Sequence, residues 1–349
     1  MATRRSLLGQ VALGLGVMAC RGLVAQPADR AHYVGVETSI ATGLSRALFV
    51  SSSGERLGAT DLDFRAHGMA QHGSVLAVFP RRPGNRVALA RTDSLEILTV
   101  IDAPRGRHFF GHGAFTADGA TLLVAENDLA TLHGGVGVYE TRAPFRRLGQ
   151  IDLPGPGPHE IIRHPTRDLF FIALGGIETH PDYGRLPLNL DVFRSQILEL
   201  DIRRSGVGEF GHWDGTEGIS LRHLAFGADE TLMIGGQLVD PERGRPTNIL
   251  WQCRKGQGEI VTAGRLLAGY VSSVASRGDD TLVTSKEAHL ALLLRDGEVV
   301  EATRVDGASA AALTSKTAVY SGYRRIEIGS TTLGTADGRE FDNHGLALA

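Results

Sequence analysis

The chain contains almost no cysteine, since Cys20 and Cys253 are its only two in 349 residues. We expect residues 1–25 to be removed as an export signal, which leaves Cys253 alone and excludes an internal disulfide in the mature protein. Basic residues are not in excess, because 36 Lys and Arg face 39 Asp and Glu, so the charge does not indicate a nucleic-acid-binding protein. No segment has a sustained helical period of three to four residues, which argues against a helical fold.

Familiar catalytic motifs are also absent. The sequence has no Walker loop, no GxGxxG after a predicted strand, no CxxC pair and no GxSxG elbow. Nothing therefore points directly to P-loop, dinucleotide, dithiol or serine-hydrolase chemistry.

The N-terminus has the pattern of an export signal. Thr3–Leu8 (TRRSLL) matches the twin-arginine pattern, and the mildly apolar, glycine-containing run that follows to Ala19 is too short for an ordinary membrane span. Cleavage after Ala25 fits the small-residue rule, and it predicts a periplasmic protein with no transmembrane span. Lipidation of Cys20 at a weak lipobox is the alternative. Twin-arginine export carries folded proteins, often with a cofactor already bound, which hints at a cofactor in this protein.

Short β-prone runs punctuated by glycine turns fill the rest of the chain, and one pattern recurs. Each copy begins with a related head, is followed about ten residues later by a second apolar strand, and then by two further short strands. Four strands per unit at this spacing are typical of a propeller blade. The heads contain His67 (RAHGMA), His112 (GHGAF), His159 (GPHEII), His223 (LRHLAF), Ser273 (SSVAS), Ser309 (ASAAAL) and His344 (DNHGLAL).

The number of heads predicts the number of blades. The last head, at His344, has no room for three further strands, but three runs precede the first head: Tyr33–Glu37, Arg46–Ser52 and Arg56–Asp63. The C-terminal strand would thus become the innermost strand of a blade whose outer strands come from the N-terminus, which removes open sheet edges. We predict an all-β, seven-bladed β-propeller over residues 26–349, as one domain.

This register also predicts where polar residues gather. In a propeller the inner strands start on one face, and the loops after the second strands return to that face. The histidines of the heads should therefore ring one mouth of the axial channel, beside the residues at the ends of the second strands. The candidate ligand-binding residues on this face are Arg81, Arg82, Glu126, Asn127, Glu178, Arg222 and Gln237.

The arginines allow two interpretations. Arg81 and Arg82 could bind a carboxylate or phosphate at the mouth, or they could be surface residues with Glu126 and Asp128 as internal partners. Arg222 fits a buried ion pair better than a catalytic role.

The histidines suggest a metal. Neutral imidazole binds Zn, Cu, Fe or Ni, and a few histidines with a carboxylate such as Glu160 would make a competent site for a transition metal, with Fe, Cu or Zn as the candidates. Five histidines spread around a ring of seven cannot all bind one ion, so a subset is expected. The candidate ligands are His112, His159, His180 and His223. In the alternative, each histidine holds a neighbouring blade through a backbone hydrogen bond.

Several motifs together resemble one family. FPRRPG, GRHFFGHGAF, AEND, GPHE, GGIETHP, LNLD, RHL and DNHG, in this order, are similar to the DUF1513 family of exported bacterial proteins. The resemblance implies a propeller-like fold and twin-arginine export. Members tend to be encoded beside imelysin-like proteins and cytochrome-like oxidoreductases linked with iron uptake, which implies a metal-related periplasmic role and imelysin-like partners by analogy.

Three hypotheses for function remain open. The first is a periplasmic binding or accessory propeller that uses the histidine-lined mouth, in association with metal or iron uptake. The second is a metal-assisted hydrolase resembling propeller lactonases, with Glu160, His159 and Arg82 as candidates for general base and oxyanion support. The third is a protein–protein scaffold in which the polar insertion Gly175–Ser195 docks a partner, because long insertions at blade tips tend to carry binding function.

Overall fold

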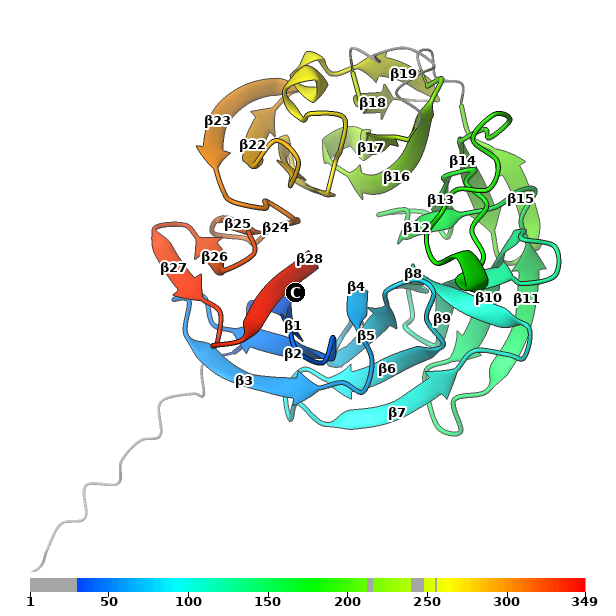
Figure 1. Cartoon of the computed structure of the whole chain (residues 1–349), viewed down its shortest axis with the longest axis horizontal. Coiled ribbons are helices and arrows are strands. Elements are labelled where there is room, and N and C mark those ends of the chain that lie inside the picture. The colour runs from blue at the N-terminus through cyan, green and yellow to red at the C-terminus, as the bar shows by residue number, and fades with distance from the viewer. Residues whose placement is uncertain (1–29, 212–215, 240–247, 255, 349) are drawn as a thin grey trace, which may run out of the picture.

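The structure, a computed structural model, describes residues 30–211, 216–239, 248–254 and 256–348, so the predicted export signal lies outside the described residues. The described residues form seven antiparallel sheets of four strands each, arranged as a ring around a central axis (Figure 1). This arrangement confirms the predicted seven-bladed β-propeller.

The blades follow one another in chain order, and the strands of each are named from the axis outward. Blade 1 comprises β28 (Arg339–Ala347), β1 (Tyr33–Ser39), β2 (Ser45–Val50) and β3 (Arg56–Asp61). Blade 2 comprises β4 (Ala66–His72), β5 (Val75–Pro80), β6 (Arg86–Arg91) and β7 (Ile97–Asp102). Blade 3 comprises β8 (Arg107–Phe115), β9 (Thr121–Asp128), β10 (Gly134–Glu140) and β11 (Arg147–Asp152). Blade 4 comprises β12 (Pro158–Arg163), β13 (Phe170–Leu174), β14 (Gln196–Asp201) and β15 (Gly206–Glu209).

The remaining blades complete the ring. Blade 5 comprises β16 (Ile219–Phe226), β17 (Leu232–Leu238), β18 (Leu250–Arg254) and β19 (Gln257–Ile260). Blade 6 comprises β20 (Ser273–Arg277), β21 (Asp280–Ser285), β22 (Leu290–Arg295) and β23 (Glu298–Arg304). Blade 7 comprises β24 (Ala310–Leu313), β25 (Ala318–Ser321), β26 (Arg325–Ile328) and β27 (Thr331–Gly334).

Helix in the described residues is limited to short 3₁₀ turns, which include η1 (Pro181–Tyr183), η2 (Ala228–Glu230) and η4 (Thr262–Leu266). None of the helices in the described ranges is long and apolar enough to cross a membrane.

The burial of each strand follows its place in the blade. The second strand, such as β5 with the sequence VLAVFP, is buried almost throughout because neighbouring blades cover both of its faces. The outermost strand, such as β7 with ILTVID, leaves most of its residues partly or fully exposed. The largest hydrophobic cluster runs between adjacent blades and includes Phe171 of blade 4, Trp251 of blade 5 and Val283 of blade 6. Burial of these side chains between blades stabilises the ring.

The two ends of the described chain close blade 1. β28 pairs antiparallel with β1, from Tyr33 opposite Ala347 to Ser39 opposite Arg339. The predicted strand closure is therefore confirmed, and its register makes His344 part of an inner strand.

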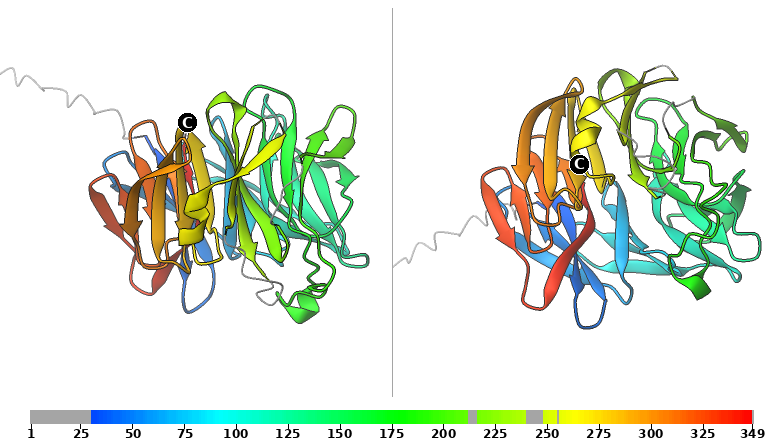
Figure 2. Two further views of the ribbon diagram at one scale, coloured as in Figure 1. Left: turned by 90° about the horizontal axis from the view of Figure 1, so that it is seen from above. Right: turned by 45° about the horizontal axis from the view of Figure 1, so that its top comes forward.

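The insertion Gly175–Ser195 connects β13 to β14 and contains η1. Figure 2 shows η1 and the C-terminal end of β28 on opposite faces of the disc, which we call the insertion face and the terminal face. The Asn189 amide holds the insertion in shape, because Nδ2 donates to the Gly176 carbonyl at 2.9 Å and Oδ1 accepts from the Glu178 amide at 2.9 Å.

Candidate functional site

The inner strands that carry a head histidine share an irregularity. In each, the register of pairing with the second strand shifts at or next to the histidine. The shift lies between Ala66 and Met69 in β4, Phe109 and Gly113 in β8, Pro158 and Glu160 in β12, and Leu221 and His223 in β16. In β28 it lies opposite the stretch from Gly35 to Glu37 of β1. The inner strands without a histidine, β20 and β24, pair with no shift. A β-bulge changes the direction in which a side chain points. The irregularity therefore accompanies the histidine and not the propeller fold in general.

The five histidines meet inside the axial channel, where each is at most 9 % exposed. Their ring centroids are separated by 5.0 Å for His67–His112, 5.1 Å for His112–His159 and 4.9 Å for His159–His223. The circle continues with 5.0 Å for His223–His344 and 4.6 Å for His344–His67. We call these five residues the histidine cluster.

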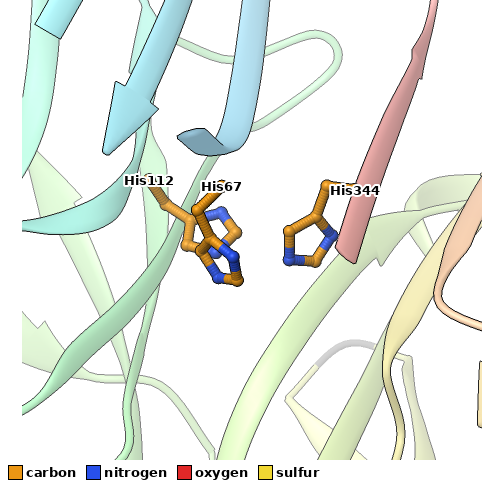
Figure 3. Close-up of side chains that lie close together, drawn as sticks. All are labelled: His67, His112 and His344. Carbon is orange, nitrogen blue, oxygen red and sulfur yellow. The ribbon is translucent and has the colours of Figure 1, made fainter. Parts of the chain in front are cut away.

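Three members lie close enough together to be candidate ligands of one metal ion. One ligand nitrogen from each of His67, His112 and His344 lies within 4.8 Å of the other two. Figure 3 shows the three rings, from β4, β8 and β28, gathered around a common space. In the cluster, the buried ring nitrogens without a hydrogen-bond partner are Nδ1 of His67, Nε2 of His112, Nδ1 of His159 and Nε2 of His344. Outside it, Nε2 of His108 also lacks a partner.

Burial keeps the cluster neutral. Desolvation lowers the pKa of His112 and of His223 to about 3, and it lowers the pKa values of His67, His159 and His344 well below the usual range. Neighbouring positive groups add to this effect for most of the cluster. Neutral imidazole is the form that binds a metal, so the cluster is ready to bind one at neutral pH.

Glu160 supplies the carboxylate beside the cluster. Its Oε2 lies 3.1 Å from Nδ1 of His223 and accepts a hydrogen bond from the Leu224 amide at 3.2 Å, while Oε1 lies 3.6 Å from Nδ1 of His112. A carboxylate at Nδ1 fixes the tautomer in which Nε2 is free to bind a metal. This is the role that a carboxylate behind the ligands performs in metal centres.

Two glycines allow the rings to pack this closely. A Cβ on Gly68 would lie 2.4 Å from the Gly111 carbonyl oxygen and 2.9 Å from Nδ1 of His112. Gly111 has φ +109°, and a Cβ there would lie 2.8 Å from Cδ2 of His67. Neither position has room for a larger residue without displacement of a cluster histidine.

On its terminal side the cluster borders a cavity of about 280 Å³. Its polar lining consists of His112, Glu160 and His344, together with Ser273 and Ser276. Small residues at the ends of the inner strands, such as Ala225 and Ala312, form much of the rest. The cluster therefore has a mostly uncharged space beside it on the terminal side.

On its insertion side the cluster borders arginines. Arg222, 5 % exposed, precedes His223 on β16, and its charge adds to burial in lowering the pKa values of His159 and His223. Arg82 follows β5, with Nη1 3.3 Å from Thr179 Oγ1 and its guanidinium carbon 4.7 Å from the centroid of the Phe110 ring.

Arg81, the neighbour of Arg82, has an acidic partner. Its Nη1 lies 3.5 Å from Oδ1 of Asp342, whose Oδ2 lies 2.9 Å from Nε of Arg65. Asp342 precedes His344 by two residues, so this ion pair ties the closing strand of blade 1 to blade 2.

Some predicted residues lie elsewhere. His180 is not in the cluster: its Nδ1 accepts from the Asp182 amide at 3.2 Å and caps η1 on the insertion. Glu126 is fully buried and bonds to Tyr139 Oη at 2.6 Å and Arg147 Nη2 at 2.8 Å, toward the outer strands of blade 3. It is not a partner of Arg81 or Arg82.

The other predicted ligand-binding residues are also placed by their contacts. The side-chain amide of Asn127 can form hydrogen bonds when its nitrogen faces the carbonyls of Leu132 and His133. In that orientation it donates to them at 3.1 and 3.3 Å. Glu178 is half-buried in the insertion, and Gln237 forms a β-bridge to Tyr270. The hydrolase hypothesis for Glu160, His159 and Arg82 stays a prediction.

Two ligand candidates were missing from the predicted metal set. His67 and His344 belong, with His112, to the group whose ring nitrogens lie within 4.8 Å of one another. They occupy the same position in the repeat as His112, and that position alone would have been reason to include them. Asp342 was not singled out at all, although it stands in the same head as His344.

Comparison with solved structures supports the fold. The chain is similar to a chain of Kuenenia stuttgartiensis hydrazine synthase, with 13 % identity, a TM-score of 0.64, and coverage of 90 % of this chain and 99 % of that one. A chain of a nidogen/laminin complex matches with 13 % identity, a TM-score of 0.55, and coverage of 91 % and 98 %. U3-55K matches with 13 % identity, a TM-score of 0.54, and coverage of 89 % and 95 %. At such identities the likeness shows the propeller fold alone.

Comparison by sequence identifies the family. No curated protein matches the chain. The family model described as "Protein of unknown function (DUF1513)" matches residues 60–348, which is most of the chain. The chain therefore belongs to the DUF1513 family.

Proposed function

We propose that this protein binds a transition-metal ion in its axial channel, through His67, His112 and His344. The observation that supports the proposal is the approach of three ligand nitrogens to within 4.8 Å of one another in a buried space. Imidazole suits Zn, Cu, Fe and Ni, so the proposed ion comes from this class. His159 and His223 complete the ring of imidazoles and offer further ligands.

The unpartnered nitrogens argue for a ligand over a purely structural role. A structural histidine would use its ring nitrogens for hydrogen bonds within the protein. In the cluster, four members each keep one buried ring nitrogen without such a bond. Each unsatisfied buried polar group costs about 1–3 kcal/mol, and a bound metal would offset that cost.

A direct test is metal titration of the purified protein after removal of metals with a chelator. We expect one equivalent of Co²⁺ to give the visible absorption bands of a low-coordinate, nitrogen-ligated ion, and Zn²⁺ to displace it. His67→Gln combined with His344→Gln should abolish the bands.

The matched control is His164→Gln. His164 is also fully buried, but its Nδ1 accepts from the Thr166 and Arg167 amides, just beyond the end of β12. This variant should retain the bands. Unchanged Co²⁺ spectra in the folded double variant, or no binding by the wild-type chain, would rule out the proposed site.

Location is part of the proposal. Export through the twin-arginine motif would place the folded chain in the periplasm, with imelysin-like proteins as partners by family analogy. Arg4→Lys combined with Arg5→Lys should leave the protein in the cytoplasm of its host, as fractionation would show. Processing and periplasmic recovery equal to those of the unchanged chain would contradict this part.

A second candidate function is docking of a protein partner on the insertion. Three large apolar side chains there are well exposed: Tyr183 at 63 %, Leu186 at 60 % and Val192 at 73 %. If these side chains form one contiguous apolar surface, it would be of the kind that marks an interaction site. Tyr183→Ser with Val192→Ser should abolish co-purification with an imelysin-like partner, whereas Ile40→Ser, at an exposed residue outside the insertion, should not. Equal co-purification by both would exclude this surface.

A further inference from the structure

Positive charge accumulates at the insertion-face side of the histidine cluster. Arg81 and Arg82 follow β5, Arg222 precedes His223 on β16, and Arg185 belongs to the insertion. Burial lowers the pKa values of Arg81, Arg82 and Arg222, and the charge of Arg185 lowers each of them further. The one carboxylate among the ion-pair partners of this group in the described residues is Asp342, which contacts Arg81 and is shared with Arg65. The group therefore carries more positive charge than its partners among the described residues neutralise.

Arg222 shows the imbalance most clearly. It is 5 % exposed, its Nε has no hydrogen-bond partner, and no described acidic residue forms an ion pair with it. Burial lowers its pKa to about 10, which still leaves the guanidinium charged at neutral pH. A buried charge without a partner is strongly destabilising, so a counter-ion at this position would stabilise the fold.

Arg82 extends the same surface. Its guanidinium rests on the ring of Phe110 and reaches Thr179, and no carboxylate of the described residues pairs with it. Arg82 packs on Phe110, which lies two residues before His112 on β8, and Arg222 directly precedes His223 on β16. Burial and then the charge of Arg222 lower the pKa of Arg82. Both arginines therefore lie next to residues of the cluster strands, and their charges add to burial in lowering the pKa of His159.

We infer that the channel mouth on the insertion face binds a small oxyanion, with carboxylate or phosphate oxygens held by Arg82 and Arg222. Guanidinium groups bind both kinds of oxygen through paired, charge-assisted hydrogen bonds. The inference rests on and deepens the proposed metal function, because an anion held at this mouth would lie next to the cluster and could act as a further ligand of the metal ion. Anion binding itself needs no metal.

The geometry also assigns separate approaches to the two ligands. A free cation is repelled by the arginines and reaches the cluster more easily from the terminal-face cavity beside Glu160. An anion, or a metal already complexed by a polycarboxylate, is attracted to the insertion face. The ligand class is thus an anionic oxygen donor.

The test is calorimetric titration of the metal-free protein with inorganic phosphate and, separately, with citrate. We expect saturable binding of at least one of them at low ionic strength, and binding weaker by tenfold or more in Arg82→Gln and in Arg222→Gln. The control is Arg203→Gln, an exposed residue that pairs with Asp168 at 2.8 Å, and it should bind as the wild type does. Citrate binding with no phosphate binding would assign the site to polycarboxylates, and the reverse would assign it to phosphate.

Two outcomes would overturn the inference. One is the absence of saturable binding of both anions by the wild-type protein. The other is undiminished binding by folded Arg82→Gln, a change at a half-buried residue that the fold should tolerate even if Arg222→Gln does not fold. The double variant His67→Gln, His344→Gln separates this inference from the proposed function, since it should lose the metal and still bind the anion.

Discussion

Nδ1 of His223 lies 3.1 Å from the carboxylate of Glu160, and this contact joins blade 5 to blade 4 inside the channel. The other carboxylate oxygen faces Nδ1 of His112 in blade 3 at 3.6 Å. One side chain of blade 4 thus faces rings from the blades on either side of it. The Nε2 atoms of both are thereby left for other ligands.

Glu160→Ala should weaken metal binding by about 10- to 100-fold, because loss of a carboxylate behind a ligand histidine releases the ring orientation. Glu160→Gln keeps a hydrogen-bond acceptor and should weaken binding less. Competition with a chromophoric chelator measures both affinities. An affinity for Zn²⁺ in Glu160→Ala equal to that of the wild type would show that Glu160 does not position the ligands.

The channel glycines give a second prediction. Gly111→Ala should reduce both stability and metal affinity, since the added Cβ would meet His67 at 2.8 Å on a backbone with φ +109°. Gly43→Ala is the matched control: Gly43 also has a positive φ, +71°, but nothing lies within 4 Å of its Cβ position. Each change should cost roughly 1 kcal/mol or more in free energy of unfolding from the backbone alone.

Only Gly111→Ala should lower metal affinity as well. Chemical denaturation and Co²⁺ titration of both variants would measure the two effects separately. Equal metal affinity in the two alanine variants would contradict the packing role of Gly111.

The pH dependence of the metal-free protein follows from the histidine pKa values. An unfolded histidine takes up a proton near pH 6.5, whereas folded His112 and His223 do so only at about 3. Between these values the unfolded state binds more protons, so stability falls as the pH falls below 6.5. Each such histidine should cost about 2 kcal/mol between about pH 7 and pH 5. Glu160, whose pKa burial raises, acts in the opposite direction and offsets part of this loss.

Denaturant unfolding at several pH values would measure this loss. His223→Gln should show a smaller slope of stability against pH, whatever its stability at neutral pH. His133→Gln, at an exposed histidine, should keep the wild-type slope. A wild-type stability that stays constant as the medium is acidified from neutrality to about pH 5 would contradict burial of neutral histidines.

The spacing of the repeated heads and strands was enough to predict the fold and much of the site, because the position of each head in the repeat decides where its histidine lies. It placed His67, His112, His159, His223 and His344 on one mouth, and the structure brings these five rings together. The close approach of the rings depends on β-bulges, which arise from pairing between strands and have no local sequence signature. Pairing also decides which way Glu126 points, since a shift of one residue reverses the face of every side chain in a strand. His180 lies on an insertion whose path no repeat constrains.

Asp342 links the closure of the ring to the charge at the mouth. It is 5 % exposed, and it pairs with Arg81 and Arg65 and accepts from Thr38 Oγ1 at 3.2 Å. Asp342→Asn removes the one carboxylate that pairs with Arg81 in the part of the chain that the structure describes. It should lower the stability of the anion-free protein by about 1.5–3 kcal/mol, because hydrogen bonds to a charged group are lost while Arg65 and Arg81 stay partly exposed.

The same change should tighten oxyanion binding, because Arg81 then lacks its internal partner and joins Arg82 and Arg222 as a donor. Phosphate or citrate, whichever binds the wild-type protein, should therefore raise the thermal midpoint of Asp342→Asn more than that of the wild type. Asp168→Asn, which releases the exposed Arg203 between β14 and β15, should respond to the anion as the wild type does. A midpoint of Asp342→Asn that the anion fails to raise would mean that the arginines of the mouth do not act together on an anion.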